Sequence, residues 1–237
     1  MDSAEMSAHV GAIVPAAGAG IRFGNRARKL FVRVDGAPLL LHALRALEEC
    51  PSVRWVVPVV RPEERAEVEA LGRRHRLAKV LRPCLGGATR GESVARGLAA
   101  LPQGARWVLV HDGARPCVSR LLIQRTVREA RRRGAVACGV PADVTVKAAD
   151  ARGEVRLTLD REQLWFVQTP QVFRRDWLTE ALARGAGQLG EFPDDAAVLE
   201  AAGFPVRMVP GDPLNLKVTT GDDLVLAEAI LRRRPTP

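Results

Sequence analysis

The chain is poor in aromatic residues: its 237 residues include four tryptophans, six phenylalanines and no tyrosine. Proteins that bind single-stranded nucleic acid usually stack bases on aromatic side chains beside a basic groove. The net charge of +9 comes mostly from arginines that are spread over predicted helices, a pattern typical of a solvated surface. Anionic small substrates explain the excess of positive charge equally well, and we expect no nucleic-acid partner.

Cysteine and long apolar runs are also scarce. Cys50, Cys84, Cys117 and Cys138 are far apart and form no C-x-x-C pair, so we predict buried thiols in a reducing compartment rather than disulfides or a zinc site. No stretch approaches the roughly twenty apolar residues of a membrane span, and the amino end has no signal-peptide pattern. We expect a soluble, cytoplasmic protein that has no membrane partner.

Short apolar runs alternate with amphipathic segments along most of the chain. Strands are predicted at 10–14, 53–60, 79–82, 107–110, 135–140 and 206–209. Helices are predicted at 38–49, 62–74, 92–101, 119–133, 176–183, 195–202 and 222–232. This succession predicts a single α/β domain over residues 1–237, with a Rossmann-like, mostly parallel sheet and helices on both faces. In such sheets ligands bind beyond the carboxyl ends of the strands.

The segment 142–164 interrupts this alternation. Residues 144–147 and 155–159 alternate apolar and polar side chains, and residues 150–153 between them have turn chemistry. We therefore predict a β-hairpin that protrudes from the domain as an arm.

A glycine-rich motif follows the first predicted strand. Residues 15–24 read Pro-Ala-Ala-Gly-Ala-Gly-Ile-Arg-Phe-Gly, and Lys29 follows. The spacing G-x-G-x-x-x-G differs from that of dinucleotide-binding loops, and the Gly-Lys-Ser/Thr ending of a P-loop is missing. Glycines let backbone N–H groups approach phosphate oxygens, while Arg22 and Lys29 add positive charge. The motif favours a triphosphate site, and a turn with two solvated cations is the ordinary alternative.

Three further segments put polar groups at predicted strand ends. Asp112 and Arg115 follow the strand at 107–110, where a carboxylate suits Mg²⁺ and a guanidinium suits a phosphate, although an ion-paired turn is an equally good interpretation. The loop at 86–93 offers backbone groups to a base, although a helix cap is its ordinary explanation. Lys217 precedes the last helix and is able to reach the same edge, whereas a lone lysine normally lies on the surface.

Together these segments resemble the 2-C-methyl-D-erythritol 4-phosphate cytidylyltransferase family. The resemblance runs from about Val10 to the final predicted helix. The matching motifs are P-A-A-G-x-G-x-R at 15–22 with Lys29, E-S-V at 92–94, V-H-D-G-A-R-P at 110–116, T-L-D-R at 158–161, L-W at 164–165, T-P-Q at 169–171 and N-L-K-V-T-T at 215–220.

The resemblance implies transfer of CMP from CTP to 2-C-methyl-D-erythritol 4-phosphate, with release of pyrophosphate, in isoprenoid precursor biosynthesis. The attacking phosphate is already an anion, so positioning and charge neutralisation matter more than a general base. By similarity, Arg22, Lys29 and Lys217 would be catalytic and stabilise the pentacoordinate phosphorus. The CTP site would be lined by Ala16, Ala17, Gly18, Gly87, Ala88 and Ser93.

The same resemblance implies a divalent cation and a homodimer. Asp112 would lie beside the ribose, the acceptor and the metal, with Mg²⁺ or another divalent cation as the expected cofactor. The acceptor phosphate would be held by Arg115, Lys217, Thr145 and Arg161. Thr145 and Arg161 would reach across from the hairpin arm of the partner subunit.

Several positions depart from the family's usual pattern. The segment Arg28-Lys29-Leu30-Phe31 stands where Pro-Lys-Gln-Tyr is common, although the lysine and an aromatic residue are kept, and Ala88 stands where a polar side chain often lies near the cytosine. Pro193 replaces a frequent threonine and leaves Asp194 as the polar candidate, and Leu214 replaces a frequent aspartate. None of these changes removes a residue of the expected cationic cluster.

Three alternatives stay open. The first is a cytidylyltransferase that acts on another polyol phosphate, such as ribitol 5-phosphate. The second, a Rossmann oxidoreductase, needs a different glycine spacing and an acidic residue about twenty positions past the loop, and neither is present. The third, a non-catalytic nucleotide or nucleic-acid binding module, predicts no turnover and a strongly salt-dependent affinity for polynucleotide.

Overall fold

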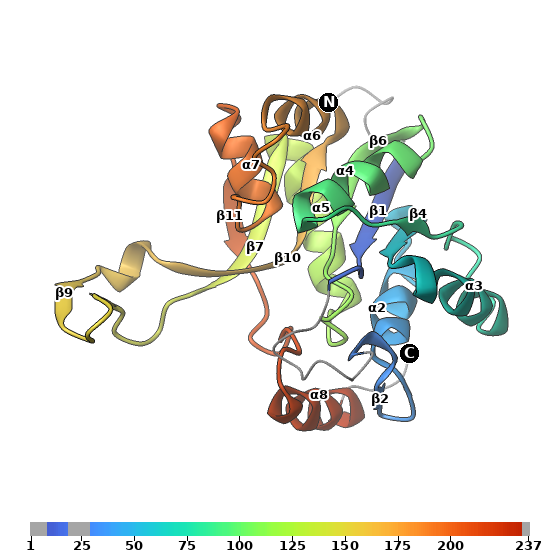
Figure 1. The fold of residues 1–237 in the computed structure, drawn as a ribbon, viewed down its shortest axis with the longest axis horizontal. Helices are drawn as coiled ribbons and strands as arrows, with labels where there is room; N and C mark the ends of the chain where they lie inside the picture. Colours follow the sequence, from blue (N-terminus) through green and yellow to red (C-terminus); the bar gives the residue numbers. More distant parts are fainter. Residues whose placement is uncertain (1–8, 19–28, 234–237) are drawn as a thin grey trace.

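A seven-stranded sheet forms the centre of the computed structural model, which describes residues 9–18 and 29–233 (Figure 1). The strand order is β11-β7-β10-β6-β1-β4-β5. The strands are β1 (His9–Pro15), β4 (Val53–Val60), β5 (Cys84–Leu85), β6 (Ala105–Val110), β7 (Ala135–Pro141), β10 (Trp165–Arg174) and β11 (Arg207–Pro210). Strand β10 runs antiparallel to β6 and β7, and the other neighbours are parallel. The predicted mostly parallel sheet is therefore confirmed.

Helices cover both faces of this sheet, as predicted. They are α2 (Leu39–Glu48), α3 (Arg65–Arg74), α4 (Arg90–Ala100), α5 (Arg120–Arg133), α6 (Arg175–Arg184), α7 (Asp195–Ala201) and α8 (Gly221–Arg233). One buried cluster joins α2 and α5 to Ala12 and Val14 of β1, and a second joins α4 and α6 to Ile13. Within the described residues, no helix has the length and apolar character needed to cross a membrane.

Strand β1 illustrates why the sheet lies between two layers. Successive side chains of a strand point to opposite faces, and Ala12, Ile13 and Val14 are each 0% exposed. A near-continuous apolar run of this kind is typical of a parallel strand that is covered on both sides. Gly11 in this strand leaves room for the residue that follows α4, because a Cβ there would lie 2.6 Å from Leu101 Cδ2.

The predicted strand at 79–82 is wrong. Val80 makes a single bridge to Val56, and the edge strand β5 comes later along the chain. The Glu48 carboxylate accepts hydrogen bonds from the backbone N–H groups of Ala78 (3.0 Å) and Lys79 (2.9 Å), which bends the chain before the bridge. Pro83 has no N–H to donate and interrupts the ladder after it.

A small hairpin that was not predicted precedes α2. Its strands are β2 (Arg33–Val34) and β3 (Ala37–Pro38). The turn residues Asp35 and Gly36 have φ values of 44° and 74°. Two successive residues with positive φ and the sequence Asp-Gly are typical of a two-residue hairpin turn, so the signal was present in the sequence.

The hairpin arm is present and extends from the body of the protein (Figure 1). It spans residues 142–164 and contains β8 (Lys147–Ala149) and β9 (Val155–Thr158), whose residues are all exposed. The turn lies at 150–153 as predicted, because the Asp150 carboxylate accepts from the N–H groups of Arg152 (2.9 Å) and Glu154 (3.1 Å). The first strand is Lys147–Ala149 rather than 144–147, and Lys147 lies opposite Thr158 of β9.

Candidate active site

Backbone hydrogen bonds bring four segments to the carboxyl ends of β1, β4 and β6. The Ala16 N–H donates to Val59 O (2.7 Å), and the Gly86 N–H donates to Val60 O (2.9 Å). The Val218 N–H donates to Ala114 O (2.9 Å). The segments at 16–18, 86–93, 111–115 and 215–218 therefore meet at one edge of the sheet, where ligands of doubly wound folds bind.

Asp112 lies at the centre of a cluster of cations. Lys217 Nζ is 2.7 Å from Asp112 Oδ2, and Arg90 Nη2 is 3.2 Å from Oδ1. Arg115 Nε lies 3.9 Å from Oδ2. Burial by itself raises the pKa of the Asp112 carboxyl, but Arg90 and Lys217 outweigh it and hold that pKa well below its usual range. Asp112 is therefore ionised at neutral pH, and the predicted gathering of Asp112, Arg115 and Lys217 is observed.

Arg115 is directed into the protein. Its guanidinium donates to the backbone oxygens of Asn215 (2.7 Å) and Val167 (3.4 Å), and its side chain is 10% exposed. These bonds tie the loop after β6 to β10 and to the segment that carries Lys217. In this arrangement Arg115 holds the site together, and contact with a substrate phosphate remains a prediction.

A chain of hydrogen bonds fixes the backbone of Asp112. The Asp112 N–H donates to Thr169 Oγ1 (3.0 Å), so that hydroxyl is available to donate to His111 Nδ1 (3.1 Å). His111 Nε2 then carries a proton and donates to Arg115 O (3.2 Å). Burial of this imidazole lowers the pKa of His111 to about 4. His111 is therefore a neutral link between β10 and the loop after β6.

The pH dependence of stability follows from this buried histidine. The unfolded chain binds a proton on His111 near pH 6.5, whereas the folded chain binds it only near pH 4. The free energy of unfolding therefore decreases as pH falls from 6.5 to 4, by at most roughly 3 kcal/mol from this group. We expect His111→Asn to remove that part of the pH dependence in urea unfolding. Parallel curves for the two proteins over this interval would contradict the assignment.

The loop before α4 is organised around a helix cap. Thr89 Oγ1 accepts from the Glu92 N–H (3.1 Å), and the Glu92 carboxylate accepts from the Ala88 N–H (2.8 Å), an arrangement close to a capping box. The Gly87 N–H donates to Ser93 Oγ (3.1 Å). The cap that was the ordinary explanation of Thr89 is thus observed, and it also orders Gly87, Ala88 and Ser93.

The loop after β1 lies against this capped loop. A Cβ on Gly86 would be 2.4 Å from Ala17 Cβ, so the glycine permits the close approach. The same Cβ would be 3.0 Å from Ser93 Oγ, so Ala17 and Ser93 both lie against Gly86. Lys29 opens a short 3-10 turn, η2 (Lys29–Phe31), whereas Arg22 lies outside the described residues.

Thr145 and Arg161 lie apart from this cluster. Both belong to the arm, which extends from the sheet in Figure 1. Arg161 opens the 3-10 turn η4 (Arg161–Gln163), and its guanidinium donates to Asp143 O (3.2 Å). Within one chain these two residues are therefore not brought to Asp112.

Several buried or part-buried polar residues of the site had no role in the sequence prediction. Arg90 bridges Asp112 and Asp195, and its Nη1 lies 2.8 Å from Asp195 Oδ2. Asn215 Nδ2 donates to Thr169 O (2.8 Å). Thr169 and Asn215 lie in the T-P-Q and N-L-K-V-T-T motifs, so these motifs could have identified them as site residues. Arg90 offered no such signal, because one part-buried arginine cannot be distinguished from the many exposed arginines of this sequence.

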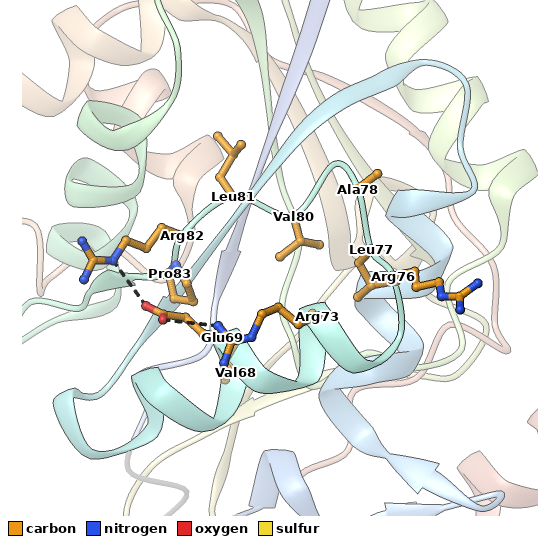
Figure 2. A pocket seen from close by; sticks show the side chains of 11 residues that line it. Val68, Glu69, Arg73, Arg76, Leu77, Ala78, Val80, Leu81, Arg82 and Pro83 are labelled. Carbon is orange, nitrogen blue, oxygen red and sulfur yellow. Dashed lines mark hydrogen bonds and ion pairs between the residues drawn. The ribbon is translucent and has the colours of Figure 1, made fainter.

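A pocket of about 470 Å³ lies elsewhere, beside α3 and the segment that follows it (Figure 2). Its lining combines apolar side chains such as Val68, Leu77 and Val80 with arginines. Figure 2 shows the ion pair between Arg82 and Glu69, in which Nε lies 3.3 Å from Oε1. None of the predicted site residues lines this pocket, so it is separate from the Asp112 cluster.

Comparison with known proteins connects this geometry to one family. The model of the family described as IspD, 2-C-methyl-D-erythritol 4-phosphate cytidylyltransferase, matches residues 10–233. The cytidylyltransferase of that name from Desulforamulus reducens is 41% identical over 225 residues, which cover 94% of this chain and 96% of the relative. The one from Pelotomaculum thermopropionicum is 42% identical over 230 residues, which cover 95% of each chain.

Solved structures agree. The crystal structure of 2-C-methyl-D-erythritol 4-phosphate cytidylyltransferase from Thermus thermophilus has a TM-score of 0.75 and 34% identity, covering 93% of this chain and 98% of that one. 4-Diphosphocytidyl-2C-methyl-D-erythritol synthase from Anaerococcus prevotii has a TM-score of 0.83 and 27% identity, covering 95% and 99%. The chain therefore belongs to the 2-C-methyl-D-erythritol 4-phosphate cytidylyltransferase family and is a nucleotidyltransferase of isoprenoid precursor biosynthesis.

Proposed function

We propose that the protein performs its family's reaction at the Asp112 cluster. An oxygen of the 2-C-methyl-D-erythritol 4-phosphate attacks the α-phosphorus of CTP, and the bond from that phosphorus to the bridging oxygen of pyrophosphate breaks. The products are 4-diphosphocytidyl-2-C-methyl-D-erythritol and pyrophosphate. The observation that carries the proposal is the 2.7 Å ion pair of Lys217 with Asp112 at the carboxyl ends of the strands.

Three cations have catalytic roles in this proposal. The nucleophile is anionic, so catalysis depends on positioning and on neutralising charge at the pentacoordinate phosphorus. Lys217 leaves Asp112 to meet the acceptor phosphate, which its 38% exposed side chain allows. Arg22 and Lys29 provide positive charge from the loop after β1.

CTP occupies the two loops that meet beside Ala17. Backbone groups of Ala16, Ala17, Gly18, Gly87 and Ala88, with the Ser93 hydroxyl, line its site. Ala88 has no side-chain donor and its N–H already donates to the Glu92 carboxylate (2.8 Å), so its C=O is the polar group that it offers to cytosine. Asp194 is committed elsewhere, because its carboxylate accepts from Gln171 Nε2 (3.0 Å) and from the Ala197 N–H (2.9 Å).

Asp112 fits a divalent cation in one specific way. Mg²⁺ commonly takes one or two protein carboxylates together with substrate phosphates and water, and a bound Mg²⁺ would neutralise phosphate charge here. The described residues contain no cluster of three potential ligands, and Asp112 is the carboxylate that would hold the cation together with substrate oxygens. Its Oδ2 becomes available when Lys217 turns to the acceptor, while Arg90 keeps Oδ1 in place.

The enzyme is proposed to work as a homodimer in the cytoplasm. The arm has exposed strands with exposed apolar side chains such as Leu157 at 56%, and Phe166 near the start of β10 is 52% exposed, so a second subunit would cover this surface. Thr145 and Arg161 would then reach the acceptor in the partner's site, beside Arg115. The four cysteines are free thiols, which suits a reducing compartment.

Replacing Arg161 of the arm tests this arrangement. We expect Arg161→Ala to raise the KM for methylerythritol phosphate by about tenfold or more and to change the KM for CTP by less than about twofold, because one phosphate contact is lost. Arg156→Ala is the matched control, since Arg156 lies on the same arm and pairs with Asp150. Equal increases in both KM values would instead indicate a role in folding or dimerisation.

Product formation tests the proposed reaction. CTP, methylerythritol phosphate and Mg²⁺ should yield equal amounts of pyrophosphate and the cytidylylated alcohol, and excess chelator should stop the reaction. Turnover that persists after complete chelation would contradict the metal role alone. Absence of both products under all conditions would contradict the proposed function.

A further inference from the structure

Arg90 connects two carboxylates that lie on different elements. Its Nε and Nη2 are 3.3 Å and 3.2 Å from Asp112 Oδ1, and its Nη1 is 2.8 Å from Asp195 Oδ2. Arg90 is the first residue of α4, and Asp195 is the first residue of α7. The guanidinium therefore joins the nucleotide loop before α4 to the loop after β6 and to the start of α7.

The two close cationic partners of Asp112 differ in how firmly they are held. The exposed fractions of the two side chains are similar, 38% for Lys217 and 29% for Arg90, but Lys217 makes its contact only with the tip of a flexible side chain. Arg90 directs two donors to the same oxygen and is bound from behind by Asp195. Because a planar guanidinium with two carboxylate partners has little freedom to turn, Arg90 is the partner that remains when Lys217 moves.

The charge of Arg90 is the main interaction that favours the ionised form of Asp195. Asp195 is 1% exposed, and neither of its carboxylate oxygens has a hydrogen-bond partner among the described residues, so its polar contact is the ion pair with Arg90. Burial raises the pKa of this carboxyl, although the charge of Arg90 acts against that effect. A buried carboxylate is costly without a partner, so this residue is unfavourable unless it orients Arg90.

The position of Asp195 is itself fixed from the sheet. Gln171 on β10 accepts a hydrogen bond from the Ala196 N–H (3.1 Å) and donates one to Asp194 (3.0 Å), which holds the first turn of α7 against the strand. The clamp of Asp112, Arg90 and Asp195 is therefore anchored at both ends.

We propose that Arg90 and Asp195 are positioning residues for the reaction, a role that presupposes the proposed function of Asp112. Arg90 holds the Asp112 carboxylate in place when Lys217 leaves it for the acceptor phosphate. Asp195 keeps the Arg90 guanidinium oriented and balances its charge. Neither residue needs to touch substrate.

Non-additive kinetics test this proposal. Arg90→Gln should lower kcat by about 10- to 100-fold in the native background, and by less than about threefold when Asp112 is already asparagine, because coupled residues lose their effect together. Arg175→Gln is the matched control: Arg175 donates to four backbone oxygens between α4 and β6, away from the site. It should lower the melting temperature and change kcat by the same small factor in both backgrounds.

A second pair of variants gives an independent readout in case Arg90→Gln folds poorly. Arg90→Gln leaves Asp195 as a lone buried carboxylate, so adding Asp195→Asn should raise the melting temperature of that variant. In the native background Asp195→Asn should lower kcat by about 5- to 20-fold, and in the Arg90→Gln background it should lower kcat no further.

The outcomes separate this proposal from the proposed function. If the native enzyme forms product and Arg90→Gln costs the same factor with either residue at 112, the positioning role is wrong and the function stands. An equal cost of Asp195→Asn in both backgrounds would likewise overturn it. If the native enzyme and Asp112→Asn form product at equal rates, the proposed role of Asp112 is wrong, and the positioning role that presupposes it is wrong as well.

Discussion

Lys217→Ala is expected to lower kcat by about 10²- to 10³-fold, with a folded protein and a nearly unchanged KM for CTP. Lys217 contacts Asp112 through the tip of a flexible side chain, whereas Arg90 is also held by Asp195, so Lys217 is the partner able to turn toward the reacting phosphates. Its removal leaves Asp112 paired with Arg90 at 3.2 Å, so the carboxylate is still compensated and the site keeps its structure. Steady-state pyrophosphate release, with both substrates varied, measures the effect.

A matched lysine serves as the control for this variant. Lys79 Nζ donates to Cys50 O (2.8 Å) beyond the amino-terminal end of β4, so Lys79→Ala removes a lysine with a structural contact and no place in the site. We expect its kcat to stay within about twofold of the native value. If Lys217→Ala and Lys79→Ala have the same kcat, the catalytic role of Lys217 is contradicted.

The second large effect is expected from the loop after β1. Lys29→Ala and Arg22→Ala should each lower kcat by about 10²-fold or more, because they lose charge stabilisation that is made mainly in the transition state. The guanidinium binds two phosphate oxygens at once, while the ammonium acts as a compact point charge, so neither residue substitutes for the other. Circular dichroism and thermal unfolding should match the native protein. Native turnover in both variants would contradict the catalytic role of this loop.

The fold could be predicted where an element depends mainly on residues close together in the sequence. An apolar run such as β4 has no helical periodicity, and its predicted bounds of 53–60 match the structure. The helix starts shifted by only a few residues, since Thr89 and Ser119 cap their helices through their own side chains. The prediction of a strand at 79–82 was wrong because the conformation of this segment depends on a distant residue. Glu48 on α2 accepts hydrogen bonds from the backbone at Ala78 and Lys79.

The site was predictable where it depends on topology. Parallel strands place their carboxyl ends at one edge, so Asp112 after β6 and Lys217 before α8 were expected to meet, and they lie 2.7 Å apart. Arg115 came to the same place, although its guanidinium binds backbone oxygens. Sequence patterns carry no information about the burial of individual charged residues. Arg90 and Asp195 at the starts of α4 and α7 therefore had the same signature as surface residues near a helix cap.

Pyrophosphate release across a panel of substrates is the most direct measurement of the central claim. The native enzyme with Mg²⁺ is tested with CTP, ATP, GTP and UTP, each with methylerythritol 4-phosphate or ribitol 5-phosphate. We predict rapid release only with CTP and methylerythritol 4-phosphate. A preference for ribitol 5-phosphate would contradict the assigned acceptor and keep the phosphoryl chemistry, whereas no release with any pair would contradict catalysis at the Asp112 cluster.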